Sequence, residues 1–171
     1  MKVIDVYTGE VKIGSGNVIL RSMALGSCVA VVVYDTKSKT GGIAHVLLPG
    51  KSPRGNKINR RKYAFYAIDE LIEKMLNSGA KRTNIKASIV GGGNVLKKKD
   101  DTISKANVHS VIECLTKKKI GIIGSSVGGI ERRSVSLDIE SGDILFSVGD
   151  SNMQILKKAD LSKYITGEID E

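Results

Sequence analysis

Two apolar runs near the start of the chain predict a buried β-hairpin. Residues 29–34 form a continuous β-branched and apolar run, which is typical of a strand buried on both faces. A polar turn over residues 35–41 separates this run from a second apolar run over residues 42–48. Pro49 ends the second run, because proline cannot donate to a strand ladder. We therefore expect the two runs to pair as adjacent antiparallel strands.

Further strands are expected on both sides of this hairpin. Residues 3–13 have the pattern of short strands broken by a hairpin-like turn at residues 8–10. Late in the chain, residues 134–139 and 144–148 flank a Ser-Gly-Asp turn, which predicts a second hairpin.

Helical periodicity marks two segments in the middle of the chain. Apolar side chains recur at i, i+3, i+4 and i+7 over residues 64–76, and Gly79 is a stop signal just beyond them. A second amphipathic helix is expected from about Ser104 to Lys118. Single strands over residues 85–90 and 120–125 are expected to follow the two helices.

The order of these elements is strands, helix, strand, helix, strands. It predicts an α/β (α+β) fold with one layered, mixed β-sheet covered by two main helices. The length of 171 residues fits one domain. Residues 1–150 are expected to form the main domain, and the weakly patterned residues 151–171 a C-terminal appendage of the same single domain.

Charge and composition narrow the choice of partners. The net charge is +9, with lysine runs at residues 97–99 and 117–119, which fits either an acidic partner or a solvated, lysine-rich surface. Aromatic residues make up 4% and tryptophan is absent, so nucleic acid is not expected as a partner. No apolar run reaches the roughly 18–20 residues that span a bilayer, and the first residues lack a signal peptide's apolar stretch. We expect a cytoplasmic protein without membrane insertion.

Cys28 and His45 are the candidates for chemistry, because the chain has only two cysteines and two histidines. If Tyr34 pairs with Gly41 in the predicted hairpin, Ala30 lies opposite His45. Cys28 and His45 then lie diagonally on one face, close enough for a hydrogen bond. A shift of one residue in register would place them on opposite faces, so the sequence permits the pair without forcing it.

A thiol beside an imidazole is the minimum of a nucleophilic cysteine centre. A neighbouring imidazolium is expected to lower the pKa of Cys28 below the free value of about 8.5 and to supply a proton to a leaving group. Ser22 is the nearest short polar side chain that could orient the imidazole. Backbone N–H groups near Gly26 and Ser27 could stabilise an oxyanion. The competing interpretation is structural, since cysteine and histidine in apolar segments are more often core residues.

Other motifs favour structural interpretations. The segment 91–94 follows a strand but lacks the Lys-Ser/Thr of a phosphate-binding loop, so it predicts a tight turn. Cys114 is expected in the core under the second helix, and His109 at the surface or half-buried. The histidines and cysteines lack the short spacing of zinc ligands, so no metal and no other cofactor is expected.

Around these residues the chain resembles the chemoreceptor glutamine deamidase family, CheD. The strongest likeness lies in Leu25-Gly26-Ser27-Cys28-Val29-Ala30-Val31 and Gly41-Gly42-Ile43-Ala44-His45-Val46-Leu47-Leu48-Pro49. Gly91-Gly92-Gly93-Asn94 resembles the family's Gly-Gly-x-Asn turn, and Ile103 to Asn107 its Ile-Gly-x-x-Asn segment, with Ser104 replacing the glycine. Val127-Gly128-Gly129 resembles its Asp-Val-Gly-Gly motif, with Ser126 replacing the aspartate and Arg132-Arg133 replacing a Gly-Arg pair.

The resemblance implies an enzyme that hydrolyses the side-chain amide of particular chemoreceptor glutamines to glutamate and releases ammonia. Cys28 would be the nucleophile and His45 the base and proton donor, while Ser22 stands where the family has a threonine as third catalytic member. Three further positions are expected near the site or at a partner interface: Gly92, Asn94 and Asn107. The implied fold is layered and similar to that of deamidating bacterial toxins with a Cys–His centre.

The partners implied by the resemblance are the cytoplasmic helices of chemoreceptors (methyl-accepting chemotaxis proteins) and the phosphatase CheC, which docks on the deamidase. No cofactor is implied. The alternative interpretation is a non-catalytic or weakly catalytic adaptor that binds CheC and chemoreceptors.

Overall fold

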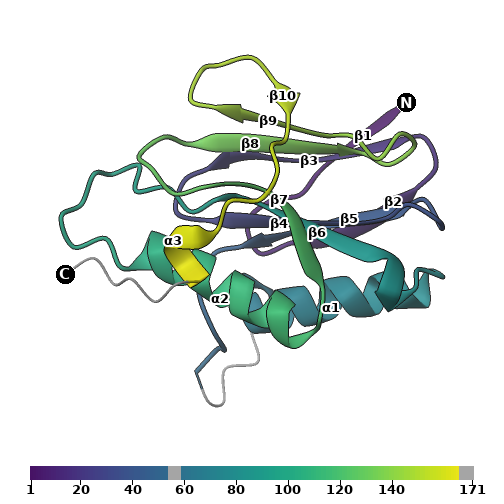
Figure 1. The fold of residues 1–171 in the computed structure, drawn as a ribbon, viewed down its shortest axis with the longest axis horizontal. Helices are drawn as coiled ribbons and strands as arrows, with labels where there is room; N and C mark the ends of the chain where they lie inside the picture. Colours follow the sequence, from purple (N-terminus) through teal and green to yellow (C-terminus); the bar gives the residue numbers. More distant parts are fainter. Residues whose placement is uncertain (54–58, 166–171) are drawn as a thin grey trace.

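The computed structural model describes residues 1–53 and 59–165, and the described strands form two sheets (Figure 1). The first sheet has the order β1-β3-β8-β9-β10, with the bounds Lys2–Asp5, Val18–Leu25, Arg133–Asp138, Ile144–Val148 and Gln154–Ile155. The second has the order β2-β5-β4-β6-β7, with the bounds Val11–Ser15, Thr40–Val46, Val29–Asp35, Ile85–Gly91 and Gly121–Val127. Both sheets mix parallel and antiparallel pairs.

The helices form a third layer. Figure 1 shows α1 (Ala64–Asn77) and α2 (Ile103–Lys117) against the face of the second sheet that is turned away from the first sheet. The predicted helices are confirmed within one residue at each end. The short α3 (Ser162–Ile165) lies near the C-terminus. The architecture is therefore sheet, sheet, helices, and the prediction of a layered α+β fold with two main helices is confirmed.

Strand β4 shows why this arrangement suits the sequence. Every residue of β4 is buried, because one face packs on helices and the other on the first sheet. Val29 and Val33 belong to the core under the helices, whereas Ala30 and Val32 belong to the core between the sheets. Two-sided burial explains the uninterrupted apolar run.

The β4–β5 hairpin has the predicted register, with Tyr34 opposite Gly41 and Ala30 opposite His45. Glycine at positions 41 and 42 lets both neighbouring layers approach the strand. A Cβ atom on Gly41 would lie 2.6 Å from Leu137 of the first sheet, and one on Gly42 would lie 2.7 Å from Leu71 of α1. The hairpin is thus packed tightly on both faces.

Two expectations about the strands are wrong. A single mixed sheet was expected, but the strands divide into two sheets, because the face of β4 that is turned away from the helices is apolar and is covered by the first sheet. A hairpin within residues 3–13 was also expected, but β1 pairs in parallel with β3 and β2 pairs with β5. The segment between β1 and β2 crosses from one sheet to the other, and Val6 in it is buried between them.

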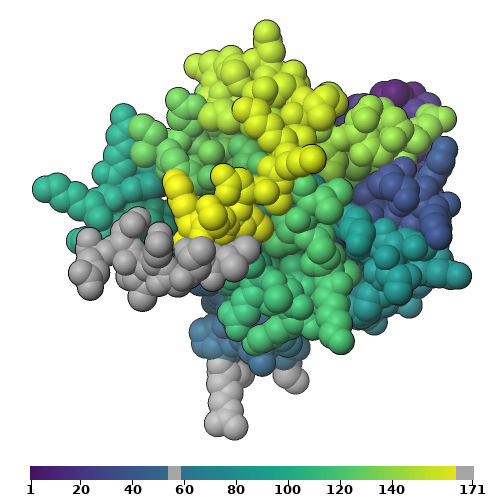
Figure 2. Space-filling model, viewed as in Figure 1, coloured from purple at the N-terminus to yellow at the C-terminus, as the bar shows by residue number. Residues whose placement is uncertain are grey.

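The end of the described chain packs on the rest of the molecule. β10 pairs antiparallel with β9, and Leu161 and Tyr164 pack in or against the core under the helices. Figure 2 shows this segment in yellow, lying across the face between the first sheet and α2. Among the described residues, no helix combines the length and apolar character needed to cross a membrane.

Candidate active site

Cys28 and His45 lie at one end of the β4–β5 hairpin, where the two strands leave their ladder. Cys28 immediately precedes β4, and His45 is the penultimate residue of β5. The register places both side chains on the face turned towards the first sheet. Cys28 is partly buried against the inter-sheet core, and His45 is 4% exposed. The sheet thus brings the thiol and the imidazole to the same face at neighbouring ladder positions.

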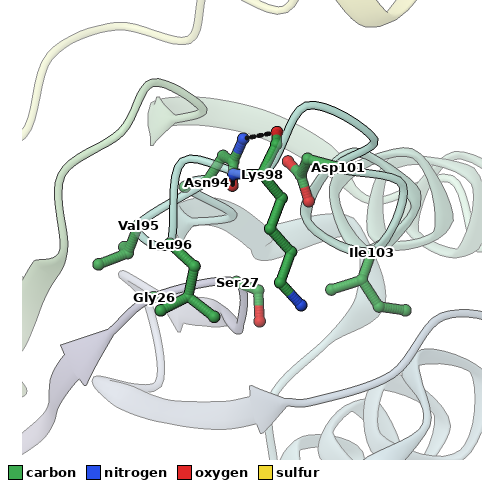
Figure 3. Close-up of a pocket in the computed structure, with 9 residues that line it drawn as sticks. Gly26, Ser27, Asn94, Val95, Leu96, Lys98, Asp101 and Ile103 are labelled. Carbon is green, nitrogen blue, oxygen red and sulfur yellow. Dashed lines mark hydrogen bonds between the residues drawn. The ribbon is translucent and has the colours of Figure 1, made fainter.

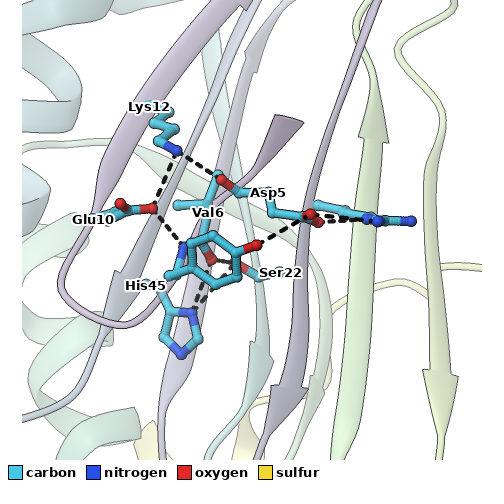
Figure 4. Close-up of polar contacts among 8 residues, drawn as sticks. Asp5, Val6, Glu10, Lys12, Ser22 and His45 are labelled. Carbon is cyan, nitrogen blue, oxygen red and sulfur yellow. Dashed lines mark hydrogen bonds and ion pairs between the residues drawn. The ribbon is translucent and has the colours of Figure 1, made fainter. Parts of the chain in front are cut away.

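The imidazole of His45 is oriented by the segment between β1 and β2 (Figure 4). Its Nδ1 lies 3.1 Å from the carbonyl oxygen of Val6. A carbonyl oxygen can only accept, so Nδ1 carries the proton in this contact and Nε2 is the unprotonated nitrogen with the lone pair. Nε2 lies 3.5 Å from the hydroxyl of Thr8, on the solvent side. This tautomer is the one that a general base needs.

Ser22 acts on the same carbonyl. Its hydroxyl donates to the Val6 oxygen over 2.7 Å and lies 3.5 Å from His45 Nδ1. Because the hydroxyl proton goes to Val6, Ser22 and His45 share this carbonyl as acceptor and are not joined by a short bond of their own. The structure brings Ser22 to His45, and the sequence pattern gave no signal for the role of Val6.

The backbone beside His45 is held as firmly as its ring. The N–H of Gly9 donates to the carbonyl of His45, and the N–H of His45 donates to the carbonyl of Glu10. Burial lowers the pKa of His45, and the charge of Glu10 opposes part of that lowering. In the sequence, residues 8–10 looked only like a turn, so their contacts with His45 were missed.

The expected electrostatics of the pair are wrong for the resting state. Burial raises the pKa of the Cys28 thiol, and burial lowers the pKa of His45 against the opposing effects of Val6 and Glu10. In the part of the chain that the structure describes, no hydrogen bond joins the Cys28 thiol to His45. Both groups are therefore neutral at rest, since desolvation disfavours a thiolate–imidazolium pair.

The turn at Cys28 is tied to the end of β6. The N–H of Gly92 donates to the carbonyl of Cys28, and the N–H of Gly93 donates to the carbonyl of Gly26. A Cβ atom on Gly91 would lie 2.2 Å from the Cys28 oxygen, so only glycine permits this close approach. Gly92 is buried beside the site, and a Cβ atom on it would lie 2.3 Å from Val108 of α2.

The backbone N–H groups of the turn at Cys28 form no hydrogen bonds to other described residues. Within the described ranges, the N–H groups of Gly26, Ser27 and Cys28 donate to no other residue. The N–H of Cys28 interacts with its own sulfur and partly opposes the rise in the thiol pKa. These are donors of the kind that can bind an oxyanion.

A cavity of about 270 Å³ opens beside this turn (Figure 3). Gly26 and Ser27 form one wall, and the loop after β6 forms the other, including the 76%-exposed Leu96. Asn94 lines the cavity, but its side chain closes its own loop by donating to the carbonyl of Lys98 and accepting from the N–H of Lys98. The cavity is apolar at its rim and lies next to the thiol-bearing turn.

Asn107 comes from α2 and is fully buried, so it lies near the site and not on a surface that a partner could touch. Its Nδ2 donates to the carbonyl oxygens of Ser27 and Leu47, each over 2.9 Å. On the same helix His109 is exposed. Cys114 was expected inside the core, but it is partly buried and packs at the edge of the core under the helices.

The residues that depart from the CheD pattern form hydrogen bonds in the structure. Ser126 accepts a hydrogen bond from the guanidinium of Arg133 over 2.9 Å, and the same guanidinium donates to the carbonyl of Gly128 over 2.6 Å. Ser104 bonds to Asp101 at the start of α2. These contacts hold the loops behind the cavity.

Comparison with known proteins identifies the family. Residues 47–148 match the family model CheD, described as CheD chemotactic sensory transduction. A probable chemoreceptor glutamine deamidase CheD of Chlorobium luteolum is 35% identical over 153 residues, covering 90% of this chain and 76% of that protein. One from Methanococcus maripaludis is 34% identical over 149 residues, covering 86% of this chain and 96% of that protein.

A further relative is longer than this chain. The probable chemoreceptor glutamine deamidase CheD 1 of Methanosarcina mazei is 43% identical over 140 residues, and the match spans 61% of its length. The matches to all three relatives extend over most of this chain. Together with the family model, they show that this chain belongs to the CheD chemotactic sensory transduction family.

Proposed function

We propose that this protein is a cytoplasmic chemoreceptor glutamine deamidase that works as a cysteine amidohydrolase. The observation that carries the proposal is the shared face of Cys28 and His45 on adjacent antiparallel strands, with His45 held in the tautomer of a base. The names of the relatives point to the same substrate, the glutamines of chemoreceptors. Cys28 is the nucleophile, His45 the base and proton donor, and Ser22 an orienting residue.

Catalysis begins from the neutral pair. As the Cys28 sulfur attacks the carboxamide carbon of a receptor glutamine, His45 Nε2 takes the thiol proton. A long or poorly aligned hydrogen bond between nucleophile and base is common in such sites before substrate binds. The oxygen of the tetrahedral intermediate becomes negative and is bound by N–H groups at Gly26, Ser27 and Cys28.

The second half of the reaction returns the enzyme to its resting state. The His45 imidazolium gives its proton to the amide nitrogen, which leaves as ammonia and creates a thioester on Cys28. His45 then takes a proton from water as the water oxygen attacks the thioester. The thiolate leaves, regains the proton, and the product is glutamate.

The surface beside the site suits a helical, acidic substrate. The exposed apolar side chains of Val95, Leu96 and Ile103 rim the cavity next to Ser27. Lys98 adds positive charge there, and the whole chain carries a charge of +9. Apolar contact would hold a receptor helix, and the charge would attract its acidic side chains.

Mass spectrometry of a cytoplasmic receptor fragment from the same organism tests this function. Each glutamine converted to glutamate adds about 1 Da, since an amide is exchanged for an acid. The expected result is conversion at a few defined glutamines, with release of an equal amount of ammonia. A receptor fragment that binds the protein but gains no mass over long incubation would contradict the proposal.

A second candidate function is an adaptor that binds the phosphatase CheC and chemoreceptors with little or no catalysis. The neutral resting state of Cys28 and His45 favours it, as does the exposed apolar rim of the cavity. Firm binding of CheC or receptor together with the absence of ammonia release would favour this function over the deamidase.

A further inference from the structure

The side chain of Asn107 joins the two chain segments that carry Cys28 and His45. Its Nδ2 donates one hydrogen bond to the carbonyl of Ser27 and one to the carbonyl of Leu47, both over 2.9 Å. Ser27 is the residue before Cys28, and Leu47 is the second residue after His45. One buried amide on α2 therefore holds both strands from the helix side.

These bonds form just where the β4–β5 ladder ends. The last paired residues are Val29 and Val46, so Cys28 and Leu47 lie beyond the ladder. The two hydrogens of Asn107 Nδ2 meet the carbonyls of Ser27 and Leu47 just past that point, while the Cys28 carbonyl accepts from the N–H of Gly92. The separation of the two strands beside the thiol is therefore set by a side chain of α2.

The bond to Ser27 also fixes the peptide group of the nucleophile. In a trans peptide the C=O and the following N–H point in opposite directions. Because the Ser27 carbonyl is held towards α2, the Cys28 N–H points away from α2, towards the inter-sheet face where the Cys28 side chain packs. This N–H is a proposed oxyanion donor, and its direction depends on Asn107.

The side-chain oxygen of Asn107 shows that packing alone does not explain why an asparagine stands at this position. Asn107 Oδ1 is buried and has no hydrogen-bond partner among the described residues. A leucine of similar size would fill the space without burying an unpaired acceptor. The two donated bonds are what an asparagine provides at this position and an apolar residue does not.

We propose that Asn107 is a positioning residue of the catalytic centre, which holds the Cys28 N–H and the spacing of Cys28 and His45. It touches no substrate, so its loss acts on the chemical step and not on substrate binding. This inference rests on the proposed function for its effect on catalysis. Its effect on the thiol can be measured without any substrate.

The test compares Asn107→Leu with the control Val111→Ala. Val111 is an equally buried residue of α2, one turn further along the helix. Asn107→Leu is expected to keep the fold and the KM but to lower kcat by about 100-fold, as misplacement of reacting groups does. Val111→Ala is expected to keep kcat.

Two readouts need no substrate. In Asn107→Leu the Cys28 amide resonance in a ¹⁵N–¹H spectrum is expected to move, and alkylation of Cys28 to shift to higher pH, because the N–H no longer supports the thiolate. Both are expected to stay in place in Val111→Ala. If Asn107→Leu does not fold, Asn107→Ser, which keeps one short donor, is measured in the same way.

The outcomes separate the two proposals. A folded Asn107 variant with wild-type kcat, amide resonance and alkylation profile would overturn the positioning role, as would an equal loss of kcat in Val111→Ala. A wild-type protein that never deamidates receptors would overturn the proposed function instead. In that case the resonance and the alkylation profile still decide the role of Asn107.

Discussion

At the scale of single residues, the carbonyl of Val6 organises the candidate site. It accepts from Ser22 and from His45, and so fixes the tautomer in which Nε2 is unprotonated. The sequence predicted Cys28, His45 and Ser22 from residue type and spacing. It could not predict Val6, since a backbone carbonyl leaves no mark in side-chain pattern, nor Thr8, which reaches His45 only after the chain crosses between sheets.

Ser22→Ala tests the shared carbonyl. Without the hydroxyl, Val6 loses one of its two donors and His45 is held less firmly, so kcat is expected to fall by about tenfold, the value of one ordinary hydrogen bond. Ser22→Thr keeps the hydroxyl and is expected to stay near the wild-type kcat. Steady-state kinetics with a receptor fragment measures both, and an unchanged kcat in Ser22→Ala would remove Ser22 from the mechanism.

The pH dependence of kcat/KM tests the neutral resting pair. Burial lowers the pKa of His45 from its ordinary value of 6.5, so the imidazole is neutral and able to accept a proton at every pH above 6.5. Burial raises the pKa of Cys28, so the thiol stays protonated to at least about 8.5. As the pH is lowered below 6.5, kcat/KM is expected to decrease because His45 becomes protonated. Above pH 6.5, kcat/KM is expected to stay level until Cys28 ionises.

A pH–rate profile of the purified protein with a receptor fragment gives this result directly. If kcat/KM instead declines as the pH is raised from 6.5 to about 8.5, the imidazole must be protonated at rest. In that case a thiolate–imidazolium pair would be present before substrate binds, against the neutral pair argued here.

At the scale of elements, the β4–β5 hairpin was predictable and its surroundings were not. The apolar run of residues 29–34 and the polar turn after it predict the strand pairing locally, and the structure adopts one of the registers that the sequence permitted. The first sheet depends on pairing between strands distant in sequence, such as β3 with β8, for which a single sequence carries no local signal. The face shared by Cys28 and His45 was therefore predicted, but not the sheet that it faces.

Gly42→Ala tests the tight packing of the hairpin. Its Cβ would lie 2.7 Å from Leu71, 2.8 Å from Ile13 and 3.1 Å from a backbone oxygen, so the layers must move apart. The free energy of unfolding is expected to fall by about 1–3 kcal/mol. In the control Gly121→Ala the new Cβ meets only the end of Lys86 at 3.9 Å, and the change is expected to stay within about 0.5 kcal/mol.

Urea unfolding followed by circular dichroism compares the two glycine variants at one temperature. Equal stability of Gly42→Ala and the wild type would show that α1 does not pack closely on β5. A large loss in Gly121→Ala would point instead to a general intolerance of alanine in the second sheet.

At the scale of the whole molecule, the positive charge favours encounter with an acidic receptor surface. Lys98 lines the cavity beside Ser27, so Lys98→Glu is expected to raise KM while kcat stays close to the wild type. Lys37→Glu makes the same charge change at the opposite end of the β4–β5 hairpin and is expected to leave KM nearly unchanged. Kinetics at low and at physiological salt should show the difference shrinking as salt screens it. Equal effects of the two variants would assign the result to net charge alone.

The central claim is that Cys28 forms the covalent intermediate, and the pair Cys28→Ala and Cys114→Ala tests it most directly. Both variants remove one partly buried thiol, but only Cys28 lies on the face of His45. Mass spectrometry of the receptor fragment is expected to find no conversion of glutamine to glutamate with Cys28→Ala and the wild-type rate with Cys114→Ala. Conversion at the wild-type rate by Cys28→Ala would contradict the account.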